Sequence, residues 1–421
     1  MGGGLLQLVA YGAQDVYLTG NPQITFFKVV YRRHTNFAIE SIQQTFNGIS
    51  NYGSQISVTV SRNGDLINRA YLQVNVPKIP EYKGTAVKDG ADPRYVNYYG
   101  LRLLKEVVVE IGGQQIDKHY SDWMYIWNEL SLPMGKKQGY ENMVGANGDD
   151  LSAVDTTMLY IPLEFWFCRN VGLALPLIAL QYHEVKFKIL FDTMANCVHY
   201  SNAATSISAN LDASLWIDYI FLDTDERRRF AQLSHEYLIE QLQFTGQENI
   251  SSSGNNRYKL NFNHPCKELI WVSKNSGYNC WYNYTTTDNI VITEDNTADT
   301  KLNTYNDIDG KNPLTNCLLQ LNGNDRFAVR KGSYFNYVQP YQHHTNIPSN
   351  RGINVYSFAL KPEEHQPSGT LNMSRIDTAV LSMETQSGYL TGQQNGTINI
   401  YAVNYNVLRI MSGMGGLAYS N

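Results

Sequence analysis

The chain has 421 residues, a net charge of −5 at pH 7 and only 17% charged residues. This length exceeds what one ordinary hydrophobic core supports, so we expect two domains of roughly 200 residues each. A protein that coats nucleic acid would be strongly basic, so direct nucleic-acid binding is not expected. The five cysteines form no CxxC pair and are odd in number, which argues against a zinc ribbon or a disulfide framework.

Residues 1–36 are expected to form an N-terminal arm. The start of the chain lacks the basic segment of a signal peptide, and the stretch 23–31 is apolar and β-prone. The longest apolar run, 171–180, contains a proline and is too short to span a membrane, so no transmembrane segment is expected. We expect the arm to contact a neighbouring molecule through its aromatic and basic residues Phe26, Phe27, Tyr31, Arg32 and Arg33.

Alternating strand signals become regular in the first half of the chain, from residue 37 to residue 222. Apolar and polar residues alternate over 56–60 and again over 72–76, which predicts two half-buried strands. Asn63-Gly64 lies between them and predicts a hairpin turn, because both central residues of that turn need positive φ.

Other segments predict a helix and several loops. Trp123, Trp127 and Leu130 lie at helical spacing, which is typical of a packed helix. Stretches rich in turn-forming residues are expected to be long loops, which are usually functional or disordered in compact domains. These stretches are 78–99, 135–157 and 285–313.

A charged segment at the centre of the chain separates two similar halves. Strand signals over 215–222 and 237–244 flank it, and Asp223 and Glu226 have the spacing of a capping box, which predicts a helix start. Such a charge run is either a solvated helix face or a linker between the halves. We interpret residues 223–236 as a linker helix carrying Asp223, Glu226, Arg227, Arg228 and Arg229.

The second half repeats features of the first. The segment 108–116 resembles 318–326, and each is followed by an aromatic cluster, at 123–127 and at 334–337. Many short strands separated by turn signals predict two copies of one antiparallel β-domain. Periodicity alone leaves a sandwich, a barrel and a jelly roll open.

No convincing catalytic or cofactor site is found. The chain lacks GxSxG, HExxH and P-loop motifs. The segment 413–418 mimics a dinucleotide fingerprint, but no helix can follow it before Asn421, so we interpret it as a glycine-rich tail. His343-His344 has no Cys or acidic partner at ligand spacing. We therefore expect no enzyme activity, no cofactor and no metal.

Four N-x-[ST] sequons could accept glycans, although ordinary polar loop residues would give the same pattern. They lie at Asn249, Asn283, Asn372 and Asn395.

The stretch 4–28 is the most specific segment of the chain. It resembles the N-terminus of the major capsid protein of nucleocytoplasmic large DNA viruses, and is most similar to the algal-virus and giant-virus branch. Further resemblances continue to the end of the chain, so the similarity covers essentially all of it. They lie at 31–41, 61–66, 104–113, 216–225 and 399–412.

This resemblance implies an all-β fold of two eight-stranded jelly rolls, with short helices in the loops. It also implies homotrimers that form pseudo-hexagonal capsomers and tile an icosahedral virion shell. Neighbouring capsomers and minor capsid proteins beneath the shell would be partners, and assembly would occur in the host cytoplasm. Some members carry glycans on the second domain, which makes Asn283 and Asn395 the positions to test. The implied domains are the arm at 1–36, jelly rolls at 37–222 and 237–421, and the linker at 223–236.

Three other classes of protein remain open. A glycan-processing enzyme can pair two jelly rolls, but it would need converging carboxylates in a cleft. A pair of carbohydrate-binding modules would be monomeric and would bind sugars through exposed aromatic residues. A minor capsid or penton protein can have the same jelly-roll fold and would differ in its number of copies in the particle.

Overall fold

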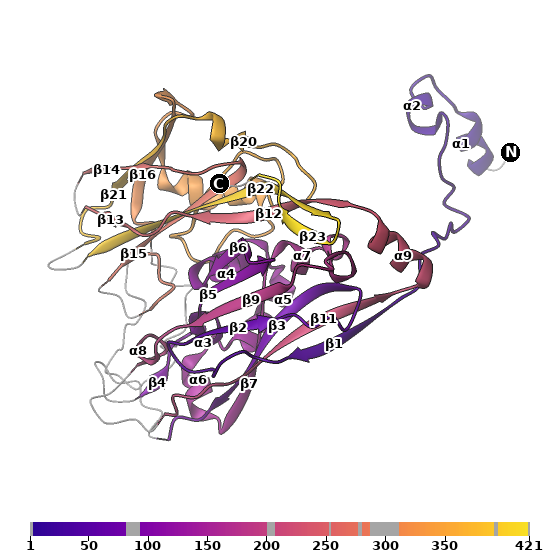
Figure 1. Ribbon diagram of the computed structural model, residues 1–421. Coiled ribbons are helices and arrows are strands. Elements are labelled where there is room, and N and C mark those ends of the chain that lie inside the picture. The colour runs from indigo at the N-terminus through magenta and orange to yellow at the C-terminus, as the bar shows by residue number, and fades with distance from the viewer. Residues whose placement is uncertain are drawn as a thin grey trace. The chain divides into compact units, whose positions relative to one another are not determined.

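The computed structural model describes residues 3–80, 93–199, 207–251, 254–276, 280–286, 311–390 and 395–419 (Figure 1). The chain divides into two compact units, Met1–Asn36 and Phe37–Asn421. The described part of the first unit holds the helices α1 (Gly3–Val9) and α2 (Val16–Thr19), which bury no residue. Its β-prone stretch forms no strand.

The first half of the larger unit, named roll 1 here, consists mainly of two antiparallel sheets. One sheet has the order β1-β11-β3-β7, with β8 beside β3, and the other has the order β2-β9-β5-β6. Their bounds are β1 (Phe37–Gln44), β2 (Gln55–Thr59), β3 (Leu66–Pro77), β5 (Leu104–Ile111), β6 (Gln114–Tyr120), β7 (Thr156–Pro162), β8 (Leu175–Pro176), β9 (Val185–Phe191) and β11 (Asp212–Leu222).

Short elements connect these strands. The strands β4 (Arg94–Tyr95) and β10 (Val198–His199) pair with each other. The helices are α3 (Tyr99–Leu103), α4 (Ser121–Ser131), α5 (Met134–Val144), α6 (Gly148–Ala153), α7 (Trp166–Arg169), η1 (Val171–Leu173), η2 (Leu177–Ala179) and α8 (Met194–Cys197).

The second half, named roll 2 here, also has two antiparallel sheets. One has the order β12-β22-β15-β19, joined by β13, β20 and β23, and the other has the order β14-β21-β16-β17, joined by β18. Their bounds are β12 (His235–Phe244), β13 (Glu248–Ile250), β14 (Asn255–Lys259), β15 (Pro265–Asn275), β16 (Leu314–Leu321), β17 (Asn324–Asp325), β18 (Arg330–Lys331), β19 (Asn354–Ser357), β20 (Leu371–Asn372), β21 (Ala379–Thr385), β22 (Gly396–Met411) and β23 (Met414–Leu417). Its helical turns are η3 (Tyr334–Val338), α10 (Gln339–His343) and η4 (Met373–Arg375).

The two rolls share one topology. When the eight principal strands of each roll are numbered along the chain, the sheets have the orders 1-8-3-6 and 2-7-4-5 in both rolls. Two four-stranded sheets with these crossing connections form a jelly roll, so the chain is a double jelly roll. The predicted fold class is confirmed. Of the sandwich, the barrel and the jelly roll that periodicity alone left open, the structure is a jelly roll.

The segments predicted to match between the halves occupy equivalent places. The β5–β6 hairpin turns at Gly112-Gly113, and the β16–β17 hairpin turns at Asn322-Gly323. All four turn residues have positive φ, between 49° and 84°, as the tight turn of a two-residue hairpin requires. A helical segment rich in aromatic residues follows in each case, α4 in roll 1 and η3 with α10 in roll 2.

The strand–helix–strand arrangement predicted at the centre of the chain is confirmed. Helix α9 (Thr224–Gln232) joins β11 to β12, and the Asp223 carboxylate caps it by accepting a hydrogen bond from the Thr224 backbone N–H at 2.8 Å. Arg227 binds Asp65 of roll 1 at 2.9 Å. Arg228 and Arg229 are exposed, and α9 buries no residue, so the helix is also a solvated one.

One predicted loop, 135–157, is wrong, because α5 and α6 occupy most of it. The Asn147 side chain caps α6 by accepting hydrogen bonds from the backbone N–H groups of Asp149 and Asp150. Gly145, in the left-handed conformation, ends α5. Burial of Tyr140 and Val144 favours α5 despite its low helix propensity. The predicted loop at 285–313 lies largely outside the described residues, as does much of 78–99.

The predicted hairpin around Asn63-Gly64 is also wrong. Strands β2 and β3 belong to different sheets, so the connection crosses the sandwich instead of pairing its neighbours. Neither Asn63 nor Gly64 has positive φ. Gly64 is instead required by a close approach, because a Cβ there would lie 2.9 Å from the Tyr219 Cβ.

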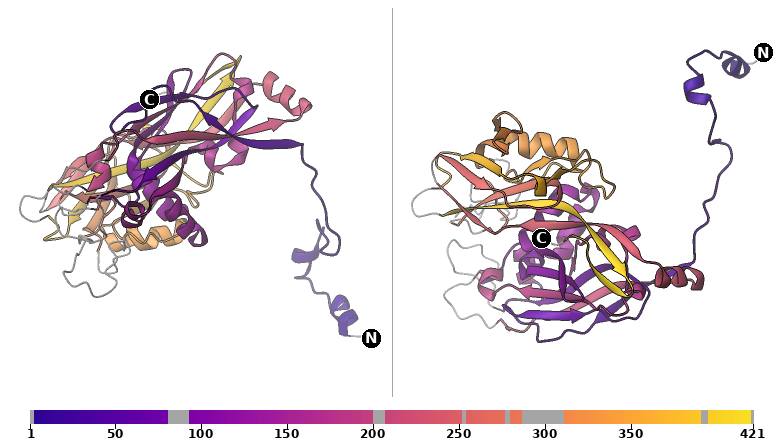
Figure 2. Two further views of the ribbon diagram at one scale, coloured as in Figure 1. Left: turned by 90° about the horizontal axis from the view of Figure 1, so that it is seen from below. Right: turned by 45° about the horizontal axis from the view of Figure 1, so that its top comes forward.

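The rolls lie side by side (Figures 1 and 2). Roll 2 has a core of its own, and the core of roll 1 extends onto one face of the β12-β22-β15-β19 sheet of roll 2. Along β15, Leu269 and Trp271 point into the core of roll 2, while Ile270 and Val272 join the core that fills roll 1. Along β22, Tyr401 and Val403 also belong to the core that fills roll 1. The β12-β22-β15-β19 sheet is therefore buried on both of its faces.

The glycine-rich segment near the C-terminus is more than a tail, because it forms strand β23 against roll 1. The Gly413 carbonyl accepts a hydrogen bond from the Tyr182 N–H at 2.9 Å. A Cβ at Gly415 would lie 2.6 Å from Leu180 Cδ2 and 3.1 Å from Ile111 Cγ2. Only a residue without a side chain fits there without displacing the core.

We expect Gly415→Val to lower the free energy of unfolding by about 1–3 kcal/mol, because it overpacks the contact between the rolls. Gly139→Ala is the control, since a Cβ at Gly139 would meet nothing within 4 Å. Urea denaturation followed by tryptophan fluorescence measures both. Equal stability of the Gly415→Val variant and the wild type would contradict the close packing of β23.

Candidate assembly surfaces

A buried group of charges joins the rolls. The Glu240 carboxylate on β12 accepts from Lys267 Nζ at 2.6 Å and from Arg169 Nη2 of roll 1 at 2.9 Å. The Lys267 side chain is 0% exposed. Burial alone would raise the pKa of Glu240, but Arg169, His365 and Lys267 outweigh it and lower the pKa to about 2. Glu240 is therefore charged at neutral pH and holds both cations.

A second polar group lies at another part of the junction. The Asp122 carboxylate on α4 accepts from Lys274 Nζ of β15 at 2.5 Å and from the Tyr284 hydroxyl at 2.9 Å. The Ser121 and Tyr282 hydroxyls lie 2.6 Å apart. Each bond crosses from roll 1 to roll 2, so these groups fix how the rolls are oriented.

His344 occupies a third buried site, inside roll 2. Its Nε2 lies 3.0 Å from Glu268, and its Nδ1 lies 2.9 Å from Glu363. Burial alone would lower the pKa of His344, but the two carboxylates outweigh it and raise the pKa to about 9. This imidazolium is an ion-pair partner. Among the residues that the structure describes, no group of three His, Cys, Asp or Glu side chains is arranged to hold a metal ion.

The outer face of the β1-β11-β3-β7 sheet differs from the corresponding face of roll 2. On β7, Leu159 and Ile161 point into the core, whereas Met158 and Tyr160 are exposed. Tyr71 on β3 and Trp216 on β11 are half-buried on the same outer side. The equivalent strands of roll 2 are covered by roll 1, whereas this aromatic face of roll 1 is not covered by the described part of roll 2.

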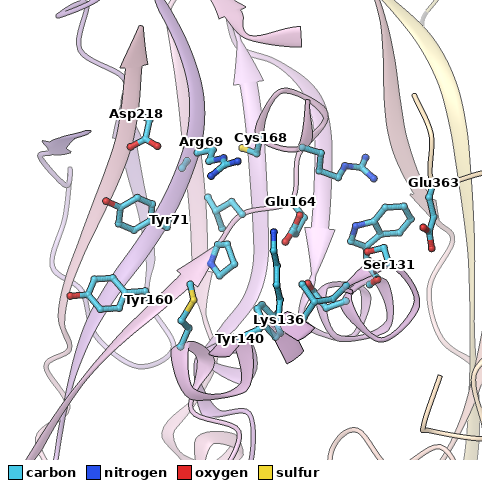
Figure 3. Close-up of a pocket in the computed structure, with 18 residues that line it drawn as sticks. Arg69, Tyr71, Ser131, Lys136, Tyr140, Tyr160, Glu164, Cys168, Asp218 and Glu363 are labelled. Carbon is cyan, nitrogen blue, oxygen red and sulfur yellow. Dashed lines mark hydrogen bonds between the residues drawn. The ribbon is translucent and has the colours of Figure 1, made fainter. Parts of the chain in front are cut away.

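A cavity of about 790 Å³ adjoins this face (Figure 3). Tyr71, Tyr160 and Asp218 stand on its strand side, and Glu363 of roll 2 lies on the other. Burial raises the pKa of the Glu164 carboxyl in its wall. Burial also raises the pKa of the Cys168 thiol to about 12, so this thiol is not a nucleophile at neutral pH.

The predicted arm residues are all exposed within their own unit. Phe27 is 97% exposed and Phe26 88%, and Tyr31, Arg32 and Arg33 are exposed as well. Exposed large apolar side chains also occur on both arm helices. Such a segment is suited to binding a partner, and contacts through these five residues remain a prediction.

The four sequons differ in accessibility. Asn249, Asn372 and Asn395 are exposed, whereas Asn283 is 3% exposed and its side-chain oxygen accepts a hydrogen bond from the Thr285 N–H at 3.0 Å. A glycan at Asn283 would have to be added before folding. Glycosylation stays a prediction, with Asn395 the more accessible of the two preferred positions.

The buried charges were missed from the sequence, although one signal was available. The runs 269–272 and 398–403 are almost continuously apolar instead of alternating. Such runs indicate strands buried on both faces, and charged residues beside them would have to be paired.

Two family models match consecutive parts of the chain. A model of the major capsid protein N-terminus matches residues 25–223, and a model of the large eukaryotic DNA virus major capsid protein matches residues 226–416. The break between them falls at the start of α9.

Individual relatives match from end to end. The chain is 52% identical over 448 residues to the major capsid protein of Pyramimonas orientalis virus and 47% identical over 456 residues to that of Paramecium bursaria Chlorella virus 1, with 100% of each chain covered. A quasi-atomic model of the PBCV-1 virus capsid matches with a TM-score of 0.81 and 42% identity, covering 94% of this chain and 100% of that one. The Faustovirus major capsid protein, 14% identical with a TM-score of 0.70 and 95% and 94% coverage, shares the fold.

We expect Glu240→Gln to lower the free energy of unfolding by about 3–5 kcal/mol at pH 7, because it leaves buried cations without a full counter-charge. A carboxyl whose pKa is lowered on folding stabilises the protein above its unfolded pKa of roughly 4.3. The difference between wild type and variant should therefore shrink as pH falls from 5 towards 2.

Glu236→Gln is the matched control, because the Glu236–Arg409 pair on the same strand β12 is exposed, and its loss should cost below about 1 kcal/mol. Denaturation at several pH values measures both variants. If Glu240→Gln lowers the free energy of unfolding no more than Glu236→Gln does, the proposed role of the buried charges at the junction is contradicted.

Proposed function

The chain belongs to the major capsid protein family of large eukaryotic DNA viruses and is a component of the virion shell, and we propose that it assembles there as homotrimers. Each trimer would present six jelly rolls and form a pseudo-hexagonal capsomer that tiles an icosahedral shell. The role is structural, and the proposal includes no enzymatic step.

The repetition of one topology in two rolls carries this proposal. A heterologous interface generates a closed ring when its rotation closes. Two equivalent rolls per chain give six similar units after three copies, which is the symmetry of a hexagonal tile. The aromatic face of roll 1, which the described part of roll 2 does not cover, supports the proposal, because interfaces are rich in aromatic residues.

Contacts beyond the trimer would involve the arm and other proteins of the particle. We place the arm residues around Phe26 and Tyr31 at contacts with neighbouring capsomers, with minor capsid proteins as further partners beneath the shell. Assembly would take place in the host cytoplasm. In the described part of the chain, no helix has the length and apolar character needed to cross a membrane.

We expect the purified protein to have a mass of about 143 kDa in solution, three times the 47.8 kDa of one chain. Light scattering behind a sizing column measures this mass. A species of 47.8 kDa at every concentration would contradict the trimer and would return the carbohydrate-binding and enzyme alternatives to consideration. A minor capsid or penton protein would be distinguished by its copy number in the particle.

Deletion of residues 1–36 should leave soluble trimers and block shell assembly, because residues 37–421 form a compact unit of their own. Electron microscopy of co-expressed shell components follows assembly, and light scattering follows the trimer. Replacing Phe26, Phe27 and Tyr31 with serine in the full chain is the gentler variant. Shells of normal number and size from both variants would contradict the proposed role of the arm.

A further inference from the structure

A lysine and an asparagine lie close together on neighbouring strands of roll 2. In the register of β15 and β22, Asn399 is opposite Val272, and Lys274 is opposite Thr397. Lys274 and Asn399 are therefore diagonal neighbours on one face of the sheet, a separation that a long side chain spans. This is the face that roll 1 covers, because Val272 belongs to the core that fills roll 1.

One carboxylate contacts both of these side chains. Asp122 Oδ1 accepts a hydrogen bond from Lys274 Nζ at 2.5 Å, and Asp122 Oδ2 accepts one from Asn399 Nδ2 at 3.5 Å. Asp122 lies on α4 of roll 1, whereas the other two residues belong to roll 2. The three groups therefore meet only where the two rolls are docked.

The surroundings of this group are closed and aromatic. The Tyr284 hydroxyl donates to Asp122 at 2.9 Å, and Tyr284 and Tyr401 are almost completely buried. Burial and then the Asp122 charge raise the pKa of both hydroxyls well above its ordinary value, so they remain protonated. A cavity of about 700 Å³ borders Asp122, Lys274 and Asn399 and provides a path by which a small product leaves.

The Asn399 carbonyl oxygen stands out in this group. Asn399 is 1% exposed, and its Oδ1 accepts no hydrogen bond from any residue that the structure describes. A buried polar atom without a partner is costly and rare in folded proteins. The amide is thus held beside an amine and a carboxylate with its carbonyl group unpaired.

We propose that Lys274 and Asn399 form an intramolecular isopeptide bond, with Asp122 as the proton carrier. Lys274 Nζ gives a proton to Asp122 and attacks Asn399 Cγ, so the Cγ–Nζ bond forms and the Cγ–Nδ2 bond breaks. Nζ loses two protons in all and keeps one as the amide N–H. Asp122 passes both protons to Nδ2, which leaves as an ammonium ion, and the Asp122 carboxylate is restored.

The geometry supplies what this reaction needs. A lysine amine is a nucleophile once it has lost a proton, and a carboxylate within hydrogen-bond reach is the group to remove that proton. Fixing the amine beside the amide replaces a bimolecular encounter with an intramolecular one, which greatly raises the rate. Because Asp122 comes from roll 1, the bond would form only after the rolls have docked correctly.

The bond would join β15 to β22 and close a loop from residue 274 to residue 399. A covalent link across a long loop restricts the unfolded chain and thereby stabilises the folded one, as a disulfide does. The five cysteines are all free, so the isopeptide bond would give this chain a covalent link that reducing conditions do not break.

Intact mass spectrometry of the denatured full-length chain tests the proposal. We expect the wild type to be lighter than the mass calculated from its sequence by one ammonia molecule. Trypsin should fail to cut after Lys274, and the digest should contain a branched peptide that joins Lys274 to Asn399. Cyclisation of an asparagine to a succinimide also releases ammonia, but it leaves the bond after Lys274 open to trypsin.

Lys274→Arg is the decisive variant, because a guanidinium keeps the charge beside Asp122 and remains protonated. We expect this variant to have its full calculated mass. Asp122→Asn should also lack the bond, and Lys274→Arg decides the question if Asp122→Asn fails to fold. Lys188→Arg is the matched control, because Lys188 Nζ also lies 2.5 Å from a carboxylate, that of Glu110, and it should retain the loss of ammonia.

Two results would overturn the proposal. One is a wild-type chain of full mass that trypsin cuts after Lys274, which would show that Lys274 and Asp122 form an ion pair only. The other is a loss of ammonia that persists in Lys274→Arg, which would place the modification elsewhere in the chain.

Discussion

Burial of both faces of the β12-β22-β15-β19 sheet is the constraint on which the rest of the structure depends. One face needs the second sheet of roll 2, and the other needs roll 1. Ile270 and Val272 therefore belong to the core that fills roll 1, whereas Leu269 and Trp271 belong to that of roll 2. The two jelly rolls consequently form one compact unit. The linker helix α9 connects two rolls that are already in contact through buried apolar residues.

Burial on this scale forces the charged groups at the junction into pairs. Lys267 is fully buried, and an unpaired ammonium there would cost several kcal/mol. Glu240 neutralises the charge of Lys267 within roll 2 and also binds Arg169 of roll 1. One carboxylate therefore both pairs the buried lysine and links the two rolls. Apolar contacts bring the rolls together, and these directional contacts specify their orientation.

The features predicted correctly from the sequence depend on local chemistry. Asn322-Gly323 predicts its turn because few other residue pairs adopt two consecutive positive φ values, and Asp223 predicts the start of α9 because its side chain can cap a free N–H group. The matching segments 108–116 and 318–326 indicate a repeat because both carry the local residue pattern of a hairpin. The resemblance to capsid proteins then supplied the jelly-roll topology, which periodicity could not.

The features that were missed depend on contacts between distant parts of the chain. Asn63-Gly64 has turn chemistry, but Tyr219 packs against it from a strand far along the sequence. Helix α5 has weak propensity and is stabilised by the burial of Tyr140 and Val144. The partners of Glu240 lie on three separate segments. The two residues of each such contact lie far apart in the sequence, so no short segment contains both of them.

The most direct test of the central claim, that two joined jelly rolls act as equivalent units of a ring, is electron microscopy of the purified protein viewed along its symmetry axis. The account predicts class averages with six lobes of two alternating kinds around one centre, because roll 1 and roll 2 share a topology but differ in their loops. Averages with three separate lobes, in which the two rolls of a chain do not occupy successive positions, would contradict it.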